Sequence, residues 1–182
     1  NLKSAVGVDI SEEAISLAKR TSRENGTDRF AALNSDLNDL KGKVDFGCNT
    51  LVTCNPPYKA PNAGLKNPDG VFAAARHEVA CTLRDIISVS ARLLQTSGRL
   101  CMCQRPERLA EITDLMREFK LEPKRLRLVC KRVGKEPWLV LIEGRKCANT
   151  GLRIEPTLYV YENGEYSPEM IRIYGPYKEA YL

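Results

Sequence analysis

The sequence is poor in the residues and patterns that mark several classes of protein. It has a single histidine, His77, which excludes a His-rich metal site, and we expect no bound metal. No apolar run approaches the roughly 20 residues that a membrane-spanning helix needs, so no membrane contact is expected. The seven cysteines include no CxxC pair. Such scattered cysteines are typical of reduced thiols in a cytoplasmic protein and not of a disulfide framework.

The composition that remains is that of a globular protein. Hydrophobic residues make up 43% and charged residues 28% of the 182 residues, values that argue against disorder and fit one packed domain. The net charge of +5 permits a polyanionic partner without requiring one. The sequence begins at Asn1, with neither a methionine nor a signal peptide.

Predicted strands and helices alternate along the chain. Short apolar runs predict strands, and amphipathic runs flanked by capping residues, proline or glycine predict helices. The predicted strands are Ala5 to Asp9, Phe30 to Leu33, Thr50 to Cys54, Leu100 to Cys103, Arg125 to Cys130 and Trp138 to Glu143. One predicted helix is capped by Ser11 and stopped by Gly26, one runs from Val71 to Leu94 before a stop at Gly98, and one begins at Pro106. Residues 59–69, rich in Pro, Gly and Asn, predict a mobile loop.

This alternation predicts an α/β fold in three layers, with a mostly parallel sheet covered by helices on both faces. The last two predicted strands have no helix between them, so we expect them to form an antiparallel pair. Cys101 and Cys103 share one face of their strand, and we assign both to the core.

The chain changes character after Gly144. Tyr159-Val160-Tyr161 and the residues around Tyr166 flank Asn163-Gly164, which is a strong signal for a β-hairpin. We therefore expect a main domain of residues 1–144 and a C-terminal extension of residues 145–182 that contains the hairpin.

The segment richest in chemistry is Asn55-Pro56-Pro57-Tyr58, which directly follows a predicted strand. The prolines make it rigid, and open α/β sheets bind ligands at the carboxyl ends of their strands. The Asn55 side-chain carbonyl and the Pro56 backbone carbonyl offer two acceptors to the hydrogens of an exocyclic amine. They would aim its lone pair at an electrophilic methyl group and stabilise the positive charge that develops. Tyr58 offers an aromatic face to an extruded base. The alternative is a turn that merely ends a strand.

Asn-Pro-Pro-Tyr after an apolar strand resembles the catalytic motif of class I S-adenosylmethionine-dependent amino-methyltransferases, which have a Rossmann-like sheet. The resemblance implies S-adenosylmethionine as the cofactor, with Asn55 beside it. It also implies that Asp9 binds the cofactor ribose and that Ile10 packs on the cofactor adenine. Asp36 and Leu37 match the family position that reads the adenine amine. The alternatives are a helix N-cap for Asp9 and an Asx-turn for Asp36.

A wider set of segments resembles the bacterial valine-tRNA adenine-N6 methyltransferases, which act on the adenine at tRNA position 37. These segments are residues 52–58, 75–78, 81–83, 105–109, 122–125 and 159–161. The resemblance implies a cytoplasmic enzyme that transfers a methyl group from S-adenosylmethionine to the N6 amine of that adenine. It implies tRNA as the partner, and we expect no obligatory protein partner.

A basic segment agrees with an RNA substrate. The segment from residue 124 to residue 135 has no acidic residue, and its cations are Lys124, Arg125, Arg127, Lys131, Arg132 and Lys135. We expect them to contact tRNA phosphates. The alternative is a solvated edge strand that its charges protect from pairing. Arg76 and His77, near the start of a predicted helix, are further candidates for RNA contact, with a helix-start hydrogen bond as the alternative for His77.

One family feature is absent from the sequence. Class I methyltransferases carry a glycine-rich loop between their first strand and first helix, and no such loop precedes Asp9. We therefore expect Asp9 to end the second strand of the family, with roughly 60–70 residues upstream in the parent protein. Two other functions stay open: methylation of DNA adenine or of a release-factor glutamine, and a truncated non-catalytic RNA-binding fragment.

Overall fold

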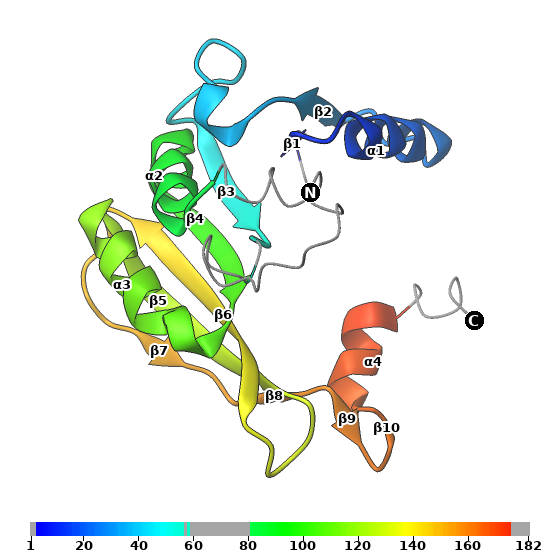
Figure 1. Cartoon of the computed structure of the whole chain (residues 1–182), viewed down its shortest axis with the longest axis vertical. Helices are drawn as coiled ribbons and strands as arrows, with labels where there is room; N and C mark the ends of the chain where they lie inside the picture. Colours follow the sequence, from blue (N-terminus) through cyan, green and yellow to red (C-terminus); the bar gives the residue numbers. More distant parts are fainter. Residues whose placement is uncertain (1–2, 57, 59–80, 176–182) are drawn as a thin grey trace, which may run out of the picture. The chain divides into compact units, whose positions relative to one another are not determined.

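A computed structural model describes residues 3–56, 58 and 81–175 (Figure 1). The chain divides into two compact units, Asn1–Asp45 and Phe46–Leu182, and each is described by itself. The predicted domain boundary between residues 144 and 145 lies inside the second unit and stays a prediction.

The first unit is a β-α-β arrangement. Its elements are β1 (Ala5–Asp9), α1 (Glu12–Glu24), β2 (Phe30–Asn34) and the short 3-10 helix η1 (Leu37–Asp39). β1 and β2 pair in parallel, with Asp9 opposite Asn34. The start of α1 is the predicted one, because the Ser11 hydroxyl accepts a hydrogen bond from the Ala14 N–H at 3.2 Å. Gly26, at a φ of 59°, follows the helix as predicted.

The second unit is built on a six-stranded sheet. Its elements are β3 (Asn49–Cys54), α2 (Leu83–Leu93), β4 (Leu94–Gln104), η2 (Pro106–Arg108), α3 (Leu109–Glu118), β5 (Leu121–Cys130), β6 (Pro137–Lys146), β7 (Arg153–Ile154), β8 (Leu158–Tyr159), β9 (Tyr161–Glu162), β10 (Glu165–Tyr166) and α4 (Pro168–Tyr174). The strand order is β3-β4-β6-β5-β7, with β8 also beside β5. Only β6 runs against its neighbours in this described sheet, which confirms the mostly parallel sheet and the antiparallel last pair.

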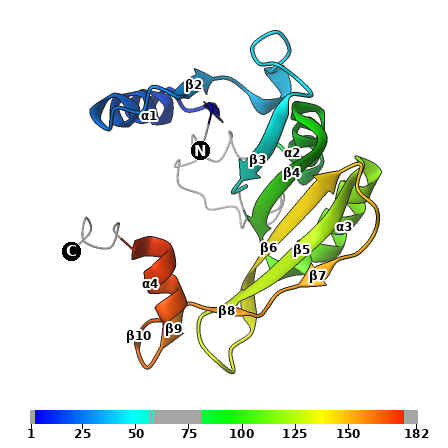
Figure 2. The same cartoon turned by 180° about the vertical axis from the view of Figure 1, so that it is seen from behind.

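Helices α2 and α3 lie on one face of this sheet (Figure 1; Figure 2). Leu100 and Met102 of β4 point to that face and are buried in the main hydrophobic core. Because successive side chains of a strand alternate between faces, Cys101 and Cys103 point the other way, where both are only partly buried. The assignment of these two cysteines to the core is therefore wrong.

The helix predicted from Val71 to Leu94 is shorter in its described part. The Thr82 hydroxyl and the Asp85 carboxylate form a capping box, so the helix begins only at Leu83. Residues 71–80 and the predicted loop at 59–69 lie outside the described residues. Gly98 does not stop the helix as predicted: it lies inside β4, where a Cβ would meet the Asn49 carbonyl oxygen at 2.9 Å. The Gln95 carbonyl oxygen, in β4 itself, lies equally close at 2.9 Å, so crowding from both strands explains the glycine.

Candidate active site

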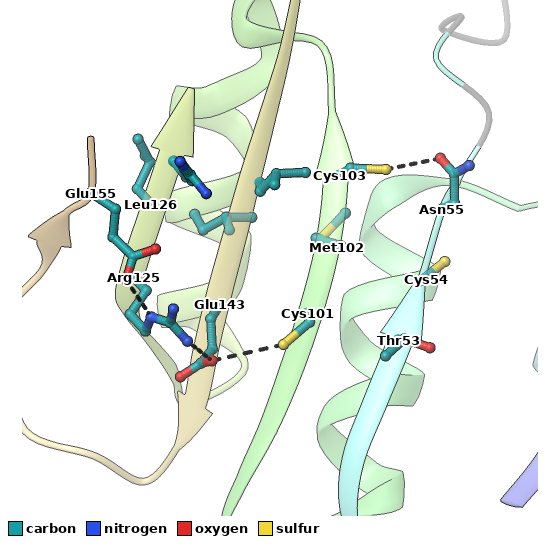
Figure 3. Close-up of a pocket in the computed structure, with 13 residues that line it drawn as sticks. Thr53, Cys54, Asn55, Cys101, Met102, Cys103, Arg125, Leu126, Glu143 and Glu155 are labelled. Atoms are coloured by element: carbon teal, nitrogen blue, oxygen red, sulfur yellow. Dashed lines mark hydrogen bonds and ion pairs between the residues drawn. The ribbon is translucent and has the colours of Figure 1, made fainter. Parts of the chain in front are cut away.

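The Asn55 side chain is held at the carboxyl end of β3 (Figure 3). Its Oδ1 accepts one hydrogen bond from the Tyr58 hydroxyl and another from the Cys103 thiol, both at 2.9 Å. The Tyr58 oxygen also lies 3.8 Å from the Cys103 sulfur. Pro56 is buried, whereas Pro57 lies outside the described residues. Cys103 reaches Asn55 because β3 and β4 are parallel neighbours. The carboxamide is thus oriented by two donors, of which one comes from a different strand.

Arg105 connects Tyr58 with Trp138 of β6. The Arg105 guanidinium lies 5.3 Å from the centre of the Tyr58 ring and 5.7 Å from that of Trp138. It also donates a hydrogen bond to the Trp138 carbonyl oxygen at 3.0 Å. Both rings pack against a small buried cluster formed by Val129, Leu139, Leu158 and Met170. The Tyr58 ring is therefore fixed by apolar packing and by a cation over one of its faces.

Two groups near Asn55, Tyr58 and Cys54, have pKa values above their ordinary ones. Burial, followed by the hydrogen bond with Cys103, raises the pKa of Tyr58. Burial and, next, the neighbouring Cys103 raise the pKa of the Cys54 thiol from 9.0 to about 11. A cysteine that reacts as a nucleophile needs a lowered pKa. Tyr58 and Cys54 therefore carry no charge near neutral pH, and Tyr58 serves as a hydrogen-bond donor.

A cavity of about 520 Å³ extends from Asn55 across the sheet face opposite α2 and α3 (Figure 3). Cys103 lines it beside Asn55, whereas Cys101 lies toward the other end, where its thiol is 3.9 Å from the Glu143 carboxylate and ion-paired side chains line the cavity. There Arg125 lies 2.8 Å from Glu155 and 3.4 Å from Glu143, measured between side-chain nitrogen and oxygen atoms. The cavity is thus neutral beside Asn55 and charged at its far end.

The predicted cofactor-binding residues of the first unit gather at one edge, where β1 and β2 end side by side. They are Asp9, Ile10, Asp36 and Leu37. Asp9 Oδ1 accepts a hydrogen bond from the Ser11 N–H at 2.8 Å, and Asp36 Oδ1 accepts one from the Asn38 N–H at 2.7 Å. In the part of the chain that the structure describes, neither Oδ2 takes part in a hydrogen bond or ion pair.

These contacts bear on the alternatives for the two carboxylates. The N-cap of α1 is Ser11 and not Asp9, whereas Asp36 does cap η1. Ile10 is 43% exposed, which leaves an apolar surface beside Asp9. An oxygen acceptor on each acid and an exposed aliphatic side chain fit the hydroxyls, amine and ring of a nucleoside.

The predicted RNA-binding residues divide into two groups. Arg127 forms a bidentate ion pair with Glu169 at 2.7 Å, and Lys124 donates to two backbone carbonyls, those of Asn149 and Thr150. Arg125 pairs as described above. The β5–β6 loop instead exposes Lys131, Arg132 and Lys135, and no ion pair between residues that the structure describes includes these three.

The edge-strand alternative for this basic segment is wrong, because β5 pairs with β6 on one side and with β7 and β8 on the other. Arg76 and His77 lie outside the described residues. The described helices include none with the length and apolar character to cross a membrane.

Three residues of the site were not predicted: Cys103, Arg105 and Trp138. The sequence does contain a signal for Arg105, which follows a predicted strand and precedes Pro106. Open α/β sheets bind their ligands at the carboxyl ends of their strands, and Arg105 stands at such an end. Cys103 ends that same predicted strand, but its contact with Asn55, like the contact of Trp138 with Arg105, depends on the strand order, which the sequence pattern does not give.

No family model matches the chain. It is 32% identical over 149 residues to the proteins named tRNA1(Val) (adenine(37)-N6)-methyltransferase from two strains of Porphyromonas gingivalis, ATCC 33277 and W83. The similarity covers 80% of this chain and 56% of each relative, so the chain spans about half the length of the curated relatives it matches.

Solved methyltransferases share the fold. A predicted O-methyltransferase, Atu636 from Agrobacterium tumefaciens, matches with a TM-score of 0.69 and 18% identity over 90% of this chain and 73% of that one. YcgJ from Bacillus subtilis matches with a TM-score of 0.55 and 13% identity over 81% and 84% of the two chains. The chain therefore has the Rossmann-like α/β fold of the class I methyltransferases, and most of its sequence is homologous to the curated tRNA adenine-N6 methyltransferases.

Proposed function

We propose that the protein to which this chain belongs is an S-adenosylmethionine-dependent methyltransferase that modifies the N6 amine of adenine 37 in valine tRNA. The observation that carries the proposal is the Asn55 carboxamide, which Tyr58 and Cys103 hold at the carboxyl end of β3. The 32% identity to proteins of that name supports tRNA as the substrate. The methyltransferase fold supports the cofactor.

The proposed chemistry depends on two fixed acceptors. An adenine N6 amine is a poor nucleophile because its lone pair is delocalised into the ring. Asn55 Oδ1 and the Pro56 carbonyl would each accept one N–H of the amine, which directs the lone pair away from both acceptors. When bound, S-adenosylmethionine supplies the electrophilic methyl group. The acceptors stabilise the positive charge that develops on the nitrogen. The amine loses a proton only after it is methylated. Because the positively charged nitrogen is then acidic, no strong general base is needed.

The two donors on Asn55 have different roles in this proposal. Oδ1 already accepts hydrogen bonds from Tyr58 and Cys103, so one of them yields when the amine binds. A thiol is a weaker donor than a hydroxyl, so the Cys103 bond is the one replaced. Tyr58 keeps the carboxamide oriented. Because Arg105 covers one face of the Tyr58 ring, the flipped adenine would stack on the other face.

The first unit would hold the cofactor nucleoside. Asp9 Oδ2 would accept hydrogen bonds from ribose hydroxyls, and Asp36 Oδ2 would accept one from the adenine amine. Ile10 would cover the adenine ring with its exposed side chain. Each carboxylate keeps its Oδ1 bond to the backbone, which fixes its direction before the nucleoside arrives.

The test is the variant Asn55→Ala in the complete gene product. Loss of the acceptor should lower methylation of tRNA by about 100-fold or more, because it removes charge stabilisation in the transition state. Affinity for tRNA should not change. Asn149→Ala, at an exposed position outside the site, is the matched control and should retain activity. An active Asn55→Ala enzyme would contradict the mechanism.

The substrate and the cofactor need separate measurements. Incorporation of labelled methyl groups should be compared for bulk tRNA, DNA and release factor, and the proposal expects tRNA alone to be labelled. Labelling of DNA or release factor would establish one of the other amine acceptors instead. Calorimetry of the complete protein with S-adenosylmethionine should show binding, and its absence would leave only a non-catalytic RNA-binding function.

A further inference from the structure

Three tyrosines form an exposed stack at the C-terminal hairpin of the second unit. Tyr161 of β9 and Tyr166 of β10 lie opposite each other, with ring centres 5.3 Å apart and ring planes 9° from parallel. Tyr174 of α4 continues the stack, with its ring centre 6.4 Å from that of Tyr166. Their exposed fractions are 42%, 38% and 51%. A stacked aromatic surface of this kind, left in contact with water, is typical of a binding site.

The hairpin is attached to the basic β5–β6 loop. Asn163 and Gly164 have positive φ angles of 52° and 88°, as a two-residue turn of the primed type requires, and this turn sets Tyr161 opposite Tyr166. The Tyr161 N–H donates to the Lys131 carbonyl oxygen at 2.8 Å. The aromatic stack and the exposed cations thus belong to one surface.

A groove of about 1020 Å³ separates the loop from the hairpin. The side chains that matter for its chemistry are Lys131, Arg132, Lys135, Glu136, Trp138 and Tyr161. Of the charged residues that line it in the described structure, three are cations and one is an anion. No ion pair neutralises the three cations within the part of the chain that the structure describes. The groove therefore has a net positive charge and aromatic walls.

One residue belongs both to the groove and to the surroundings of Tyr58. Trp138 lines the groove, and its ring shares the Arg105 guanidinium with the Tyr58 ring. A polymer that follows the groove would thus pass from the hairpin toward the aromatic ring proposed to stack the target base.

We propose that this groove and the tyrosine stack bind unpaired nucleotides of RNA next to the nucleotide that is modified. Lys131, Arg132 and Lys135 would contact phosphates, while a base stacks on the outer face of Tyr161, the ring that lines the groove and that Tyr166 and Tyr174 support from behind. Stacking accepts every base because each has a π-face, so the surface would bind single strands with little sequence preference. The inference rests on the proposed function for the identity of the polymer. It adds a stacking platform that distinguishes unpaired from paired RNA.

The test compares two RNA probes on the complete protein. One probe is a hairpin that carries the valine anticodon loop, and the other is a blunt duplex with the same stem. Replacing both rings, Tyr161→Leu with Tyr166→Leu, should weaken binding of the loop probe about tenfold and leave the duplex unchanged. The variant Tyr161→Phe with Tyr166→Phe keeps both rings and should bind as the original does. Val133→Ala, which removes a 75% exposed apolar side chain from the same loop, is the matched control.

Separate measurements test whether the cations contact phosphates and whether the RNA lies beside Trp138. Lys131→Gln should weaken binding of both probes and lower the slope of log affinity against log salt by about 1. Lys19→Gln, on an exposed position of α1, should change neither. Trp138 is the only tryptophan in the sequence, so its fluorescence should change when the loop probe binds.

The outcomes separate this inference from the proposed function. If the unaltered protein methylates tRNA but the leucine variant binds the loop probe normally, only the stacking platform is overturned. Equal losses for loop and duplex would also overturn it. Binding of the groove to anionic lipid vesicles in place of RNA would assign the surface to a membrane. A protein that neither binds nor methylates tRNA would contradict the proposed function itself.

Discussion

At the carboxyl end of β3 the polar side chains are neutral and bind one another, whereas beyond the carboxyl end of β5 they are cationic and exposed. At the end of β3, Tyr58 and Cys103 hold Asn55 by hydrogen bonds. Beyond β5, Lys131 and Arg132 extend from the β5–β6 loop. Both ends lie at the same edge of the sheet because β3 and β5 run in the same direction. Holding one reactive amine requires acceptors of fixed geometry, and attracting a polyanion requires charges that act through water. Under the proposed function, this contrast separates the residues of the chemical step from those that bind RNA.

A second contrast lies inside the basic segment itself. Its strand residues Arg125 and Arg127 pair with Glu155 and Glu169, which stand much later in the sequence. Its loop residues Lys131, Arg132 and Lys135 form no ion pair with any acid in the described part of the chain. An uninterrupted run of cations in a sequence is therefore not one charged surface, because each strand position takes the partner that the sheet provides.

The largest effect should follow from removing the ring at the neutral end. Tyr58→Ala removes both the stacking surface for the base and the donor that orients Asn55, so turnover should fall by about 100-fold. Tyr58→Phe keeps the ring and loses only the hydrogen bond at 2.9 Å, so its loss should be about tenfold. Single-turnover methylation of tRNA measures both. Equal losses in the two variants would show that the hydroxyl, and not the ring, matters.

An intermediate effect, on thermal stability, should distinguish the ion-paired cations of β5 from the exposed cations of the β5–β6 loop. Arg127→Met removes the bidentate pair with Glu169 that ties β5 to α4, so the melting temperature should fall by about 2–4 °C. Lys131→Gln should leave it unchanged. Thermal unfolding and RNA titration of both variants provide the comparison. If Arg127→Met kept its melting temperature and lost RNA affinity, Arg127 would belong with the exposed cations and the contrast would disappear.

The smallest effect concerns the thiols at the neutral end. Because the Cys54 pKa is about 11, against 9.0 for an ordinary thiol, the folded protein holds this proton more tightly than the unfolded chain does. The free energy of unfolding should therefore decrease as the pH rises from 9 toward 11. Iodoacetamide at neutral pH should label the exposed Cys147 well before Cys54, as mass spectrometry of peptides would show. Early labelling of Cys54 would mean that its site is open and polar.

Features set by neighbouring residues could be predicted. The bounds of β1, the Ser11 cap of α1 and the turn at Asn163-Gly164 agree with the sequence pattern, because capping bonds and turn angles involve residues a few positions apart. The placement of Asp9 and Asp36 at one edge also follows from the pattern, since parallel strands place their carboxyl ends together.

Features set by the sheet could not be predicted in this way. The sequence predicts that Gly98 stops a helix, but the carbonyl oxygens of Asn49 in β3 and Gln95 in β4 leave no room there for a Cβ. The core assignment of Cys101 and Cys103 failed because an apolar strand does not reveal which of its faces the helices cover. Arg105 and Trp138 contribute to the site only because β4 and β6 are neighbours.

The sequence by itself determined the candidate chemistry: a carboxamide, two prolines and an aromatic ring in consecutive positions after a strand. Their order is covalent, so no folding is needed to bring them together. The tertiary structure decided what surrounds them. Cys103, 48 positions away, reaches Asn55, and acids on later segments pair with two of the six cations between residues 124 and 135, Arg125 and Arg127. These outcomes depend on strand order and register, which arise from packing over the whole sheet and not from any local stretch of sequence.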